Sequence, residues 1–423
     1  FIMEGIVFST LGAILGLVIA IVLIIKNFHS TYSLVIGALI GGLIGGGGLD
    51  GTVKAMIAGS AGMMSSILRI MTSGILAGCL VKTGSAEKIA DTIVNKLGEK
   101  NAVISIAIST MIICAVGVFI DISVITTAPI ALAVAKRTNM SKSSALLAMI
   151  GGGKSGNIIS PNPNTIATSE AFNLNLNSLM AVNIIPAIVA LIVTILLAKS
   201  MNKRFKDRVT GSDIEVMDNA SINLPSFASS IAGPIVVVLL LALRPLFDIV
   251  VDPLIALPLG GVVCLIACGE IKNISEYSAY GFSKVIGVCA LLIGTGTLSG
   301  IISNSNLQTD MVNLIETLNL APFILAPISG VLMAAATAST TAGATIASNT
   351  FAKTLIESNV NSLNAGAMVH AGATVLDSLP HGSFFHATGG SVKMSIKNRL
   401  KLIPYEAMVG LSSTIISIII YLI

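Results

Sequence analysis

Several ionisable side chains of this sequence lie inside strongly apolar segments. Asp121 sits in GVFIDISVITTAPIAL, and a second segment, HAGATVLDSLPHGSFFHATGG, contains His370, Asp377, His381 and His386. Charged groups in such surroundings are costly and usually serve a function, and histidine or a buried carboxyl group can exchange a proton near physiological pH. We expect Asp377 first, then Asp121 or His370, to carry a proton. For Asp121 the alternatives are an ion pair with a distant basic residue and a helix cap.

A second polar group surrounds Lys154 in GGGKSGNIISPNPNT, which begins at Gly151. A nucleotide-binding P-loop is excluded, because the position of its first glycine is Ala148 and an apolar helix precedes it. The glycines and prolines instead predict an unwound stretch that faces a cavity. Lys154 suits a carboxylate partner, unless it extends to the membrane surface. The candidate ligand-binding residues of this stretch are Lys154, Asn157, Ser160, Asn162, Asn164 and Thr165.

A run of hydroxyl side chains, TASTTAGAT, occupies residues 337–345. A ligand with several hydroxyl groups would find donors and acceptors at Ser339, Thr340 and Thr341. Serine and threonine also satisfy helix carbonyls in membranes, so part of the run has a structural alternative. We expect these three residues to contribute to the same site as the unwound stretch.

The composition places these groups in a membrane protein. Charged residues make up 10% of the 423 residues, against about a quarter in a soluble chain, and the mean hydropathy is +0.93. Apolar runs such as Gly5 to Ile25 approach the ~20 residues that span a bilayer. The net charge of +4 is too small to indicate a nucleic-acid partner. The five cysteines lie in apolar segments without the spacing of a metal site, and no cofactor or metal is expected.

The order of elements along the chain predicts a duplication. AMIGGGKSGNIISPNP, from Ala148, aligns without gaps with AMVHAGATVLDSLPHG, from Ala367, and pairs Asn162 with His381. An amphipathic stretch precedes each copy, at 85–97 and at 306–318. The first carries lysines and the second carries acidic residues, so the positive-inside rule places them on opposite faces of the membrane. The copies are therefore predicted to be inverted, as in secondary transporters, with His381 and Asn162 in one midplane cavity.

This reading predicts an all-α polytopic membrane protein of about ten spanning helices, two re-entrant hairpins and two broken helices, with both termini outside. The expected boundaries are a first repeat at 1–200 with a hairpin at 101–137 and a broken helix at 143–170, a cytoplasmic linker at 201–228, and a second repeat at 229–423 with a hairpin at 321–353 and a broken helix at 365–390.

Four segments carry a resemblance to a known family: GVFIDISVITTAPIALAVAKRTNMSKSS, AMIGGGKSGNIISPNPNTIA, STTAGATIASNTF and AMVHAGATVLDSLPHGSFFHATGGSV. They resemble the signature blocks of the gluconate permease (GntP) family over nearly the whole chain. The resemblance implies proton-coupled uptake of gluconate or a related sugar acid at the bacterial inner membrane. More distantly the organisation is similar to the ion transporter superfamily, which implies an elevator mechanism and a homodimer held by its scaffold.

Other functions stay open at this stage. A membrane-embedded hydrolase could use Asp121, Asp377 and the histidines, although no hydrolase motif is present. A channel is a further alternative, but paired broken helices fit alternating access better. Within the transporter class, gluconate, idonate, fructuronate, glycerate and D-serine are all possible substrates. The expected partners are a small organic anion, protons and membrane lipid.

The inverted topology predicts that Lys206 faces the cytoplasm and Asp310 faces outward, because basic loops stay inside. Cysteine replacements at the two positions, treated on whole cells with a membrane-impermeant thiol reagent, are expected to label at position 310 alone. Labelling of both positions from the same side would refute the inversion.

Overall fold

The computed structural model describes residues 7–26, 28–98, 101–210, 213, 224–247, 249, 251–307, 309–310, 313, 317, 321–380 and 382–423. Within these residues the regular structure is helical, with two isolated β-bridges. The first helices are α1 (Thr10–Ile25), α2 (Ser30–Ile44), α3 (Gly48–Ala61), α4 (Met64–Lys82), α5 (Ser85–Leu97), α6 (Ala102–Ala115), α7 (Ile120–Arg137), α8 (Lys142–Asn157), α9 (Pro163–Ala171), α10 (Leu176–Val182) and α11 (Ile184–Arg204). The later helices are α12 (Phe227–Phe247), α13 (Pro253–Cys268), α14 (Ile274–Ser303), α16 (Leu325–Thr337), α17 (Thr340–Glu357), α18 (Ser362–Gly372), α19 (Ser383–Ser391), α20 (Ile396–Leu400) and α21 (Ile403–Leu422), with short 3₁₀ turns at Ile271–Asn273 and Pro322–Ile324.

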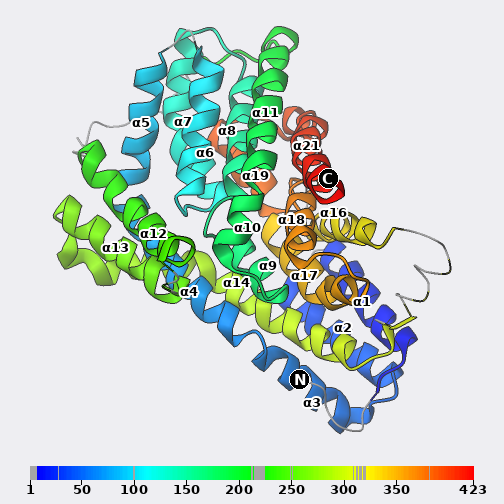
Figure 1. The fold of residues 1–423 in the computed structure, drawn as a ribbon. Coiled ribbons are helices and arrows are strands. Elements are labelled where there is room, and N and C mark those ends of the chain that lie inside the picture. The colour runs from blue at the N-terminus through cyan, green and yellow to red at the C-terminus, as the bar shows by residue number, and fades with distance from the viewer. Residues whose placement is uncertain are drawn as a thin grey trace.

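Helices in the two parts of the chain follow one another in the same order and form corresponding pairs. α1 packs on α2 as α12 packs on α13, and α6 packs on α8 as α16 packs on α18. Helices of the two parts also contact each other, since α9 packs on α17 and α7 packs on α19. In Figure 1 the broken pairs α8–α9 and α18–α19 lie between the hairpin α6–α7 and the hairpin α16–α17. The orientation of the two parts across a membrane stays a prediction.

α14 is the longest described helix and packs along α3 and α4 at points where glycine allows backbones to touch. A Cβ on Gly59 would lie 2.2 Å from the carbonyl oxygen of Gly296, and a Cβ on Gly281 would lie 1.8 Å from that of Gly74. Small residues permit such close crossings in membrane proteins. One and the same sequence separation relates Gly59 to Gly281, Gly74 to Gly296, and Gly78 to Gly300. The two contacts are thus equivalent under the predicted duplication.

Each hairpin and each broken helix has a sequence-encoded turn. Gly117 has a φ of +111° in the turn between α6 and α7, and Ala338 has a φ of +47° between α16 and α17. Ser339 then accepts a hydrogen bond from the amide of Ala342 and begins α17. The interruptions are at 158–162, before α9, and at 373–382, before α19. These positions fall within the ranges expected for the hairpins and broken helices; whether the hairpins re-enter the membrane stays a prediction.

By length and composition, three described helical segments can cross a membrane alone: Ile184–Arg204, Ile271–Ser303 and Ile396–Leu422. A further pair, Ile67–Lys82 with Ser85–Leu97, is bent by 59° at its break, and six shorter apolar helices of 10–17 residues accompany them. Fewer helices therefore meet the length and composition of a full span than the ten that the sequence predicted. The reason is that polar breaks and glycine-rich turns divide most apolar stretches into helices shorter than a bilayer. α5 has the predicted bounds, whereas most of the second amphipathic stretch, including Glu316, lies outside the described residues.

The segment after α11 folds against the start of α8. Ser143 donates from its backbone amide and its hydroxyl to the Asp207 carboxylate, at 3.2 and 2.6 Å, and the Lys142 ammonium lies 2.5 Å from the Asp213 carboxylate. A carboxylate at a helix N-terminus is favourable. α11 continues to Arg204 and α12 begins at Phe227, so the first and last residues of the expected 201–228 linker are helical.

The crossing of α4 and α14 gives a stability prediction. Gly281→Ala should lower the melting temperature in detergent, because its new methyl group would overlap the Gly74 carbonyl and overpacking costs about 1–3 kcal/mol. Gly287→Ala on the same helix is the matched control: its Cβ meets nothing within 4 Å. Fluorescence-detected size-exclusion melts would measure both. Equal melting temperatures would show that this contact does not hold the helices together.

Candidate functional site

Lys154 and Asp377 form an ion pair in the interior, with both side chains 1% exposed. Lys154, in the last turn of α8, places its Nζ 2.6 Å from Asp377 Oδ1. Nζ also donates to the carbonyl oxygens of Thr374, at 2.6 Å, and Glu406, at 3.3 Å. An ammonium has three donors, so all of them are used. Lys154 therefore does not extend to the surface, and Asp377 already compensates its charge.

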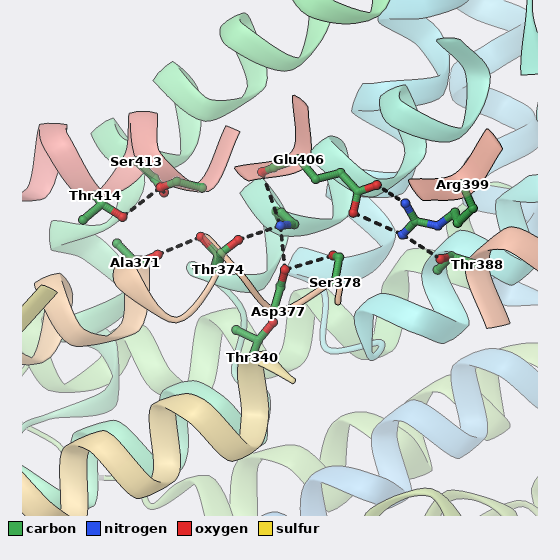
Figure 2. Close-up of polar contacts among 12 residues, drawn as sticks. Thr340, Ala371, Thr374, Asp377, Ser378, Thr388, Arg399, Glu406, Ser413 and Thr414 are labelled. Carbon is green, nitrogen blue, oxygen red and sulfur yellow. Dashed lines mark hydrogen bonds and ion pairs between the residues drawn. The ribbon is translucent and has the colours of Figure 1, made fainter. Parts of the chain in front are cut away.

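The Asp377 carboxylate is equally well satisfied (Figure 2). It lies in the interruption before α19 and accepts hydrogen bonds from the hydroxyls of Thr340, at 2.6 Å, and Ser378, at 3.0 Å, besides that of Lys154. Thr340 is the first residue of α17. One carboxylate thus joins the first broken helix, the second broken helix and the tip of the second hairpin.

A second buried ion pair lies beside the first. Arg399 of α20 donates to both carboxylate oxygens of Glu406 of α21 and to the Thr388 hydroxyl, at 3.3 Å, and its guanidinium lies over the Phe385 ring. Both charged side chains are 1% exposed. Because the Glu406 carbonyl accepts from Lys154, the two ion pairs form one connected network. The sequence analysis missed this pair; the signal was a single acidic residue in an otherwise apolar terminal helix.

Asn162 organises the interruption between α8 and α9. Its amide nitrogen donates to the Asn157 carbonyl and side-chain oxygens, and its Oδ1 accepts from the amides of Asn164 and Thr165, which starts α9 at Pro163. Asparagine before proline is a favourable helix start. Asn164 Oδ1 in turn accepts from the Thr341 hydroxyl at 2.5 Å, which connects this interruption to the second hairpin.

A cavity of about 230 Å³ lies where these elements meet. It opens between the start of α7, the first interruption, the tip of the second hairpin and α14. The expected site residues that line it are Asp121, Asn157, Asn162, Asn164, Ser339, Thr340, Thr341 and Asp377. The lining also includes Lys284 of α14, which the sequence analysis did not single out. Lys284 directly precedes residues 285–352, which contain no lysine or arginine, and no local sequence pattern connected it to the hairpins.

Four other expected residues are described away from the cavity lining. Lys154 lies behind Asp377, Thr165 is buried at the start of α9, and Ser160 is buried in the interruption. His370 is fully buried on α18, and neither ring nitrogen has a hydrogen-bond partner within the described part of the chain. His381 lies outside the described residues. His386 is exposed and bonds to the Pro380 carbonyl through Nε2.

A larger neighbouring cavity of about 370 Å³ shares Val288, Ser339 and Thr341 with the first. Its lining also includes His29, which precedes α2, and Ser30, the first residue of α2. The described residues contain no cluster of three histidine, cysteine, aspartate or glutamate side chains that could hold a metal ion. The arrangement can bind a small polar molecule beside buried charges, and a second cavity of mixed polar and apolar lining adjoins it.

Comparison with known proteins defines the class. The fold matches that of the YdaH transporter of Alcanivorax borkumensis with a TM-score of 0.67 and 13% identity, over 96% of this chain and 97% of that one. Within its described residues the chain thus shares the all-helical fold of that protein.

The family follows from the sequence comparisons. Residues 8–423 match the model of the GntP family permeases, and the chain belongs to that family. An uncharacterized transporter of Haemophilus influenzae is 54% identical over 374 residues, 88% of each chain. A gluconate permease of Bacillus subtilis is 21% identical over 372 residues, 79% of this chain and 82% of that one. The resemblance noted in the sequence is therefore confirmed at the level of the family.

The buried ion pair gives a stability prediction. Lys154→Met leaves the Asp377 carboxylate buried without a countercharge, and we expect a loss of about 3–5 kcal/mol. The double variant Lys154→Met/Asp377→Leu should lose less than Lys154→Met alone, because it removes both charges. Lys353→Met is the control, since the exposed Lys353–Glu357 pair, at 3.8 Å, should contribute less than about 1 kcal/mol. Thermal unfolding in detergent would be measured for the wild type, Lys154→Met, Asp377→Leu, the double variant and Lys353→Met. Strictly additive effects of Lys154→Met and Asp377→Leu would contradict a coupled pair.

Proposed function

We propose that this protein is a secondary active transporter that takes up gluconate or a related sugar acid together with a proton across the bacterial inner membrane. The observation that carries this proposal is the central cavity, which combines hydroxyl and amide side chains with charged groups of both signs. A small hydroxylated carboxylate matches that chemistry. The name of the Bacillus subtilis relative, gluconate permease, points in the same direction.

The size and lining of the cavity support a small, polar ligand. About 230 Å³ is below the ~300–1,000 Å³ typical of sites for drug-sized ligands. Asn164, Thr340 and Thr341 present amide and hydroxyl groups from two different parts of the chain. A substrate hydroxyl that lost such a partner would leave a buried polar group unpaired, at a cost of about 1–3 kcal/mol. The site is therefore suited to distinguish sugar acids from less hydroxylated acids.

Alternating access fits the arrangement of the helices. We propose that the repeats at 1–200 and 229–423 are inverted, and that the hairpins and broken helices move together past a scaffold of α1–α4 and α12–α14, with the scaffold holding a homodimer. The buried network supports this grouping, because it connects α8, α17, α19, α20 and α21 into one unit. Broken helices at the centre of the membrane are tolerated where they line such a cavity.

For the proton, we propose Asp121 ahead of Asp377. Three donors hold the Asp377 carboxylate, including the Lys154 ammonium, so protonation would break an ion pair in the interior. Asp121 is half-buried in the first turn of α7 and faces the cavity. His370 ranks behind both, because it does not line this cavity. The preference reverses the order expected from sequence.

The proposed function is tested by uptake into proteoliposomes. A panel of radiolabelled gluconate, idonate, fructuronate, glycerate and D-serine would be supplied with and without an imposed pH gradient. We expect accumulation of at least one sugar acid, driven by the gradient and abolished by a protonophore. Uptake that is indifferent to pH, or confined to D-serine, would contradict the proposal.

Replacement of the two carboxylates separates coupling from structure. Asp121→Asn should retain counterflow exchange and lose accumulation against a gradient, because the cavity keeps its shape but cannot take up the proton. Asp377→Asn should instead lower thermal stability, because it leaves Lys154 without its countercharge. Both variants would be compared at equal membrane expression. Accumulation by Asp121→Asn at the wild-type level would rule out Asp121 as the coupling residue.

A further inference from the structure

An organic anion in the central cavity requires a cation, because an uncompensated charge in a low-dielectric site is costly. The sequence suggested Lys154 for this role. The structure instead gives all three Lys154 donors to Asp377 and to the carbonyls of Thr374 and Glu406. Lys154 also lies behind the cavity lining. The countercharge of the substrate must therefore come from elsewhere.

Lys284 is positioned to supply it. It belongs to α14, the long helix that crosses α3 and α4, and its side chain is exposed and lines the cavity. Within the described part of the chain it forms no ion pair within 4.0 Å; its Nζ lies 4.9 Å from the centre of the Tyr280 ring. The Asp121 carboxylate lines the same cavity. An ammonium without a carboxylate partner among the described residues is available to an entering anion.

We propose that Lys284 binds the carboxylate of the substrate, while Asn164, Thr340 and Thr341 bind its hydroxyl groups. This inference rests on the proposed function and identifies the group that makes the site select an acid. The substrate would thus lie across the boundary between α14 and the unit of hairpins and broken helices. Its negative end points to the helix that the glycine contacts fix against α3 and α4.

The same geometry connects the anion with the proton. Before the substrate enters, the Lys284 ammonium and the Asp121 carboxylate are opposite charges on the wall of one cavity. The substrate carboxylate forms an ion pair with the Lys284 ammonium, and a proton from solution then bonds to a carboxylate oxygen of Asp121. The net charge of the cavity is therefore unchanged. No other co-reactant is needed. Binding of the anion thereby favours protonation of Asp121, and the coupling is reciprocal.

Affinity measurements on Lys284 variants test the proposal. In proteoliposomes, Lys284→Gln should raise the half-saturation concentration for the transported sugar acid by roughly 10- to 100-fold, the loss of one charge-assisted hydrogen bond. Inhibition by the corresponding neutral amide should change less than about twofold, since it has no carboxylate. Lys284→Arg keeps the charge and should retain most of the affinity. Lys82→Gln is the matched control, because Lys82 also lies over the Tyr280 ring but outside the cavity.

The possible outcomes distinguish a failure of the Lys284 assignment from a failure of the proposed function. Equal weakening of the acid and the amide, or an unchanged affinity for the acid, would overturn the role of Lys284 and leave the proposed function intact. If wild-type protein transports none of the acids, the proposed function fails and the Lys284 assignment fails with it. If Lys284→Gln does not fold, Lys284→Cys treated with a cationic aminoethyl thiol reagent replaces it. Recovery of acid affinity on that treatment is expected, and its absence overturns the proposal.

Discussion

The Lys154–Asp377 ion pair is the interaction on which the centre of this protein depends. An isolated charge in that interior would be expensive, so each side chain needs the other. The interruption before α19 also frees backbone carbonyls, and the Lys154 ammonium donates a hydrogen bond to one of them, the carbonyl of Thr374. The pair therefore connects the two broken helices at the interruption of the second one. Thr340 extends the same network to the tip of the second hairpin.

Around this centre the same kind of glycine contact between helices occurs twice. α14 meets α3 through Gly59 and α4 through Gly281, with backbones in contact at both crossings. Such contacts give a close, well-defined approach because no side chain can intervene. The buried ionic network, in contrast, connects the interrupted helices with one another. The cavity lies between a region held by glycine contacts and a region held by charges, which is where relative movement would change access to a ligand.

Some residues of the cavity and of the buried ionic network could be recognised from the sequence, and others could not. Asn162, Asn164 and Thr341 were recognisable because polar side chains beside proline or glycine in an apolar stretch have few other uses. Lys284 was not, because the residues with which it lines the cavity lie in other segments and it has no motif of its own. The Arg399–Glu406 pair was not, although its members are only seven positions apart, because neither belongs to a motif. The opposite error occurred at Lys154. It was predicted to pair with the carboxylate of a ligand, whereas in the structure it pairs with Asp377, 223 positions away in the sequence.

The sequence by itself determined the membrane class, the family and the places where helices stop, since apolar length, proline, glycine and capping residues act locally. Only the tertiary structure decided how the charges are distributed among partners. A lysine in an apolar segment has the same local signature whether it binds an internal carboxylate, as Lys154 does, or faces an open cavity, as Lys284 does. The difference depends on which distant carboxylates and carbonyls lie within hydrogen-bond distance, and that is set by the packing of helices far apart in the chain.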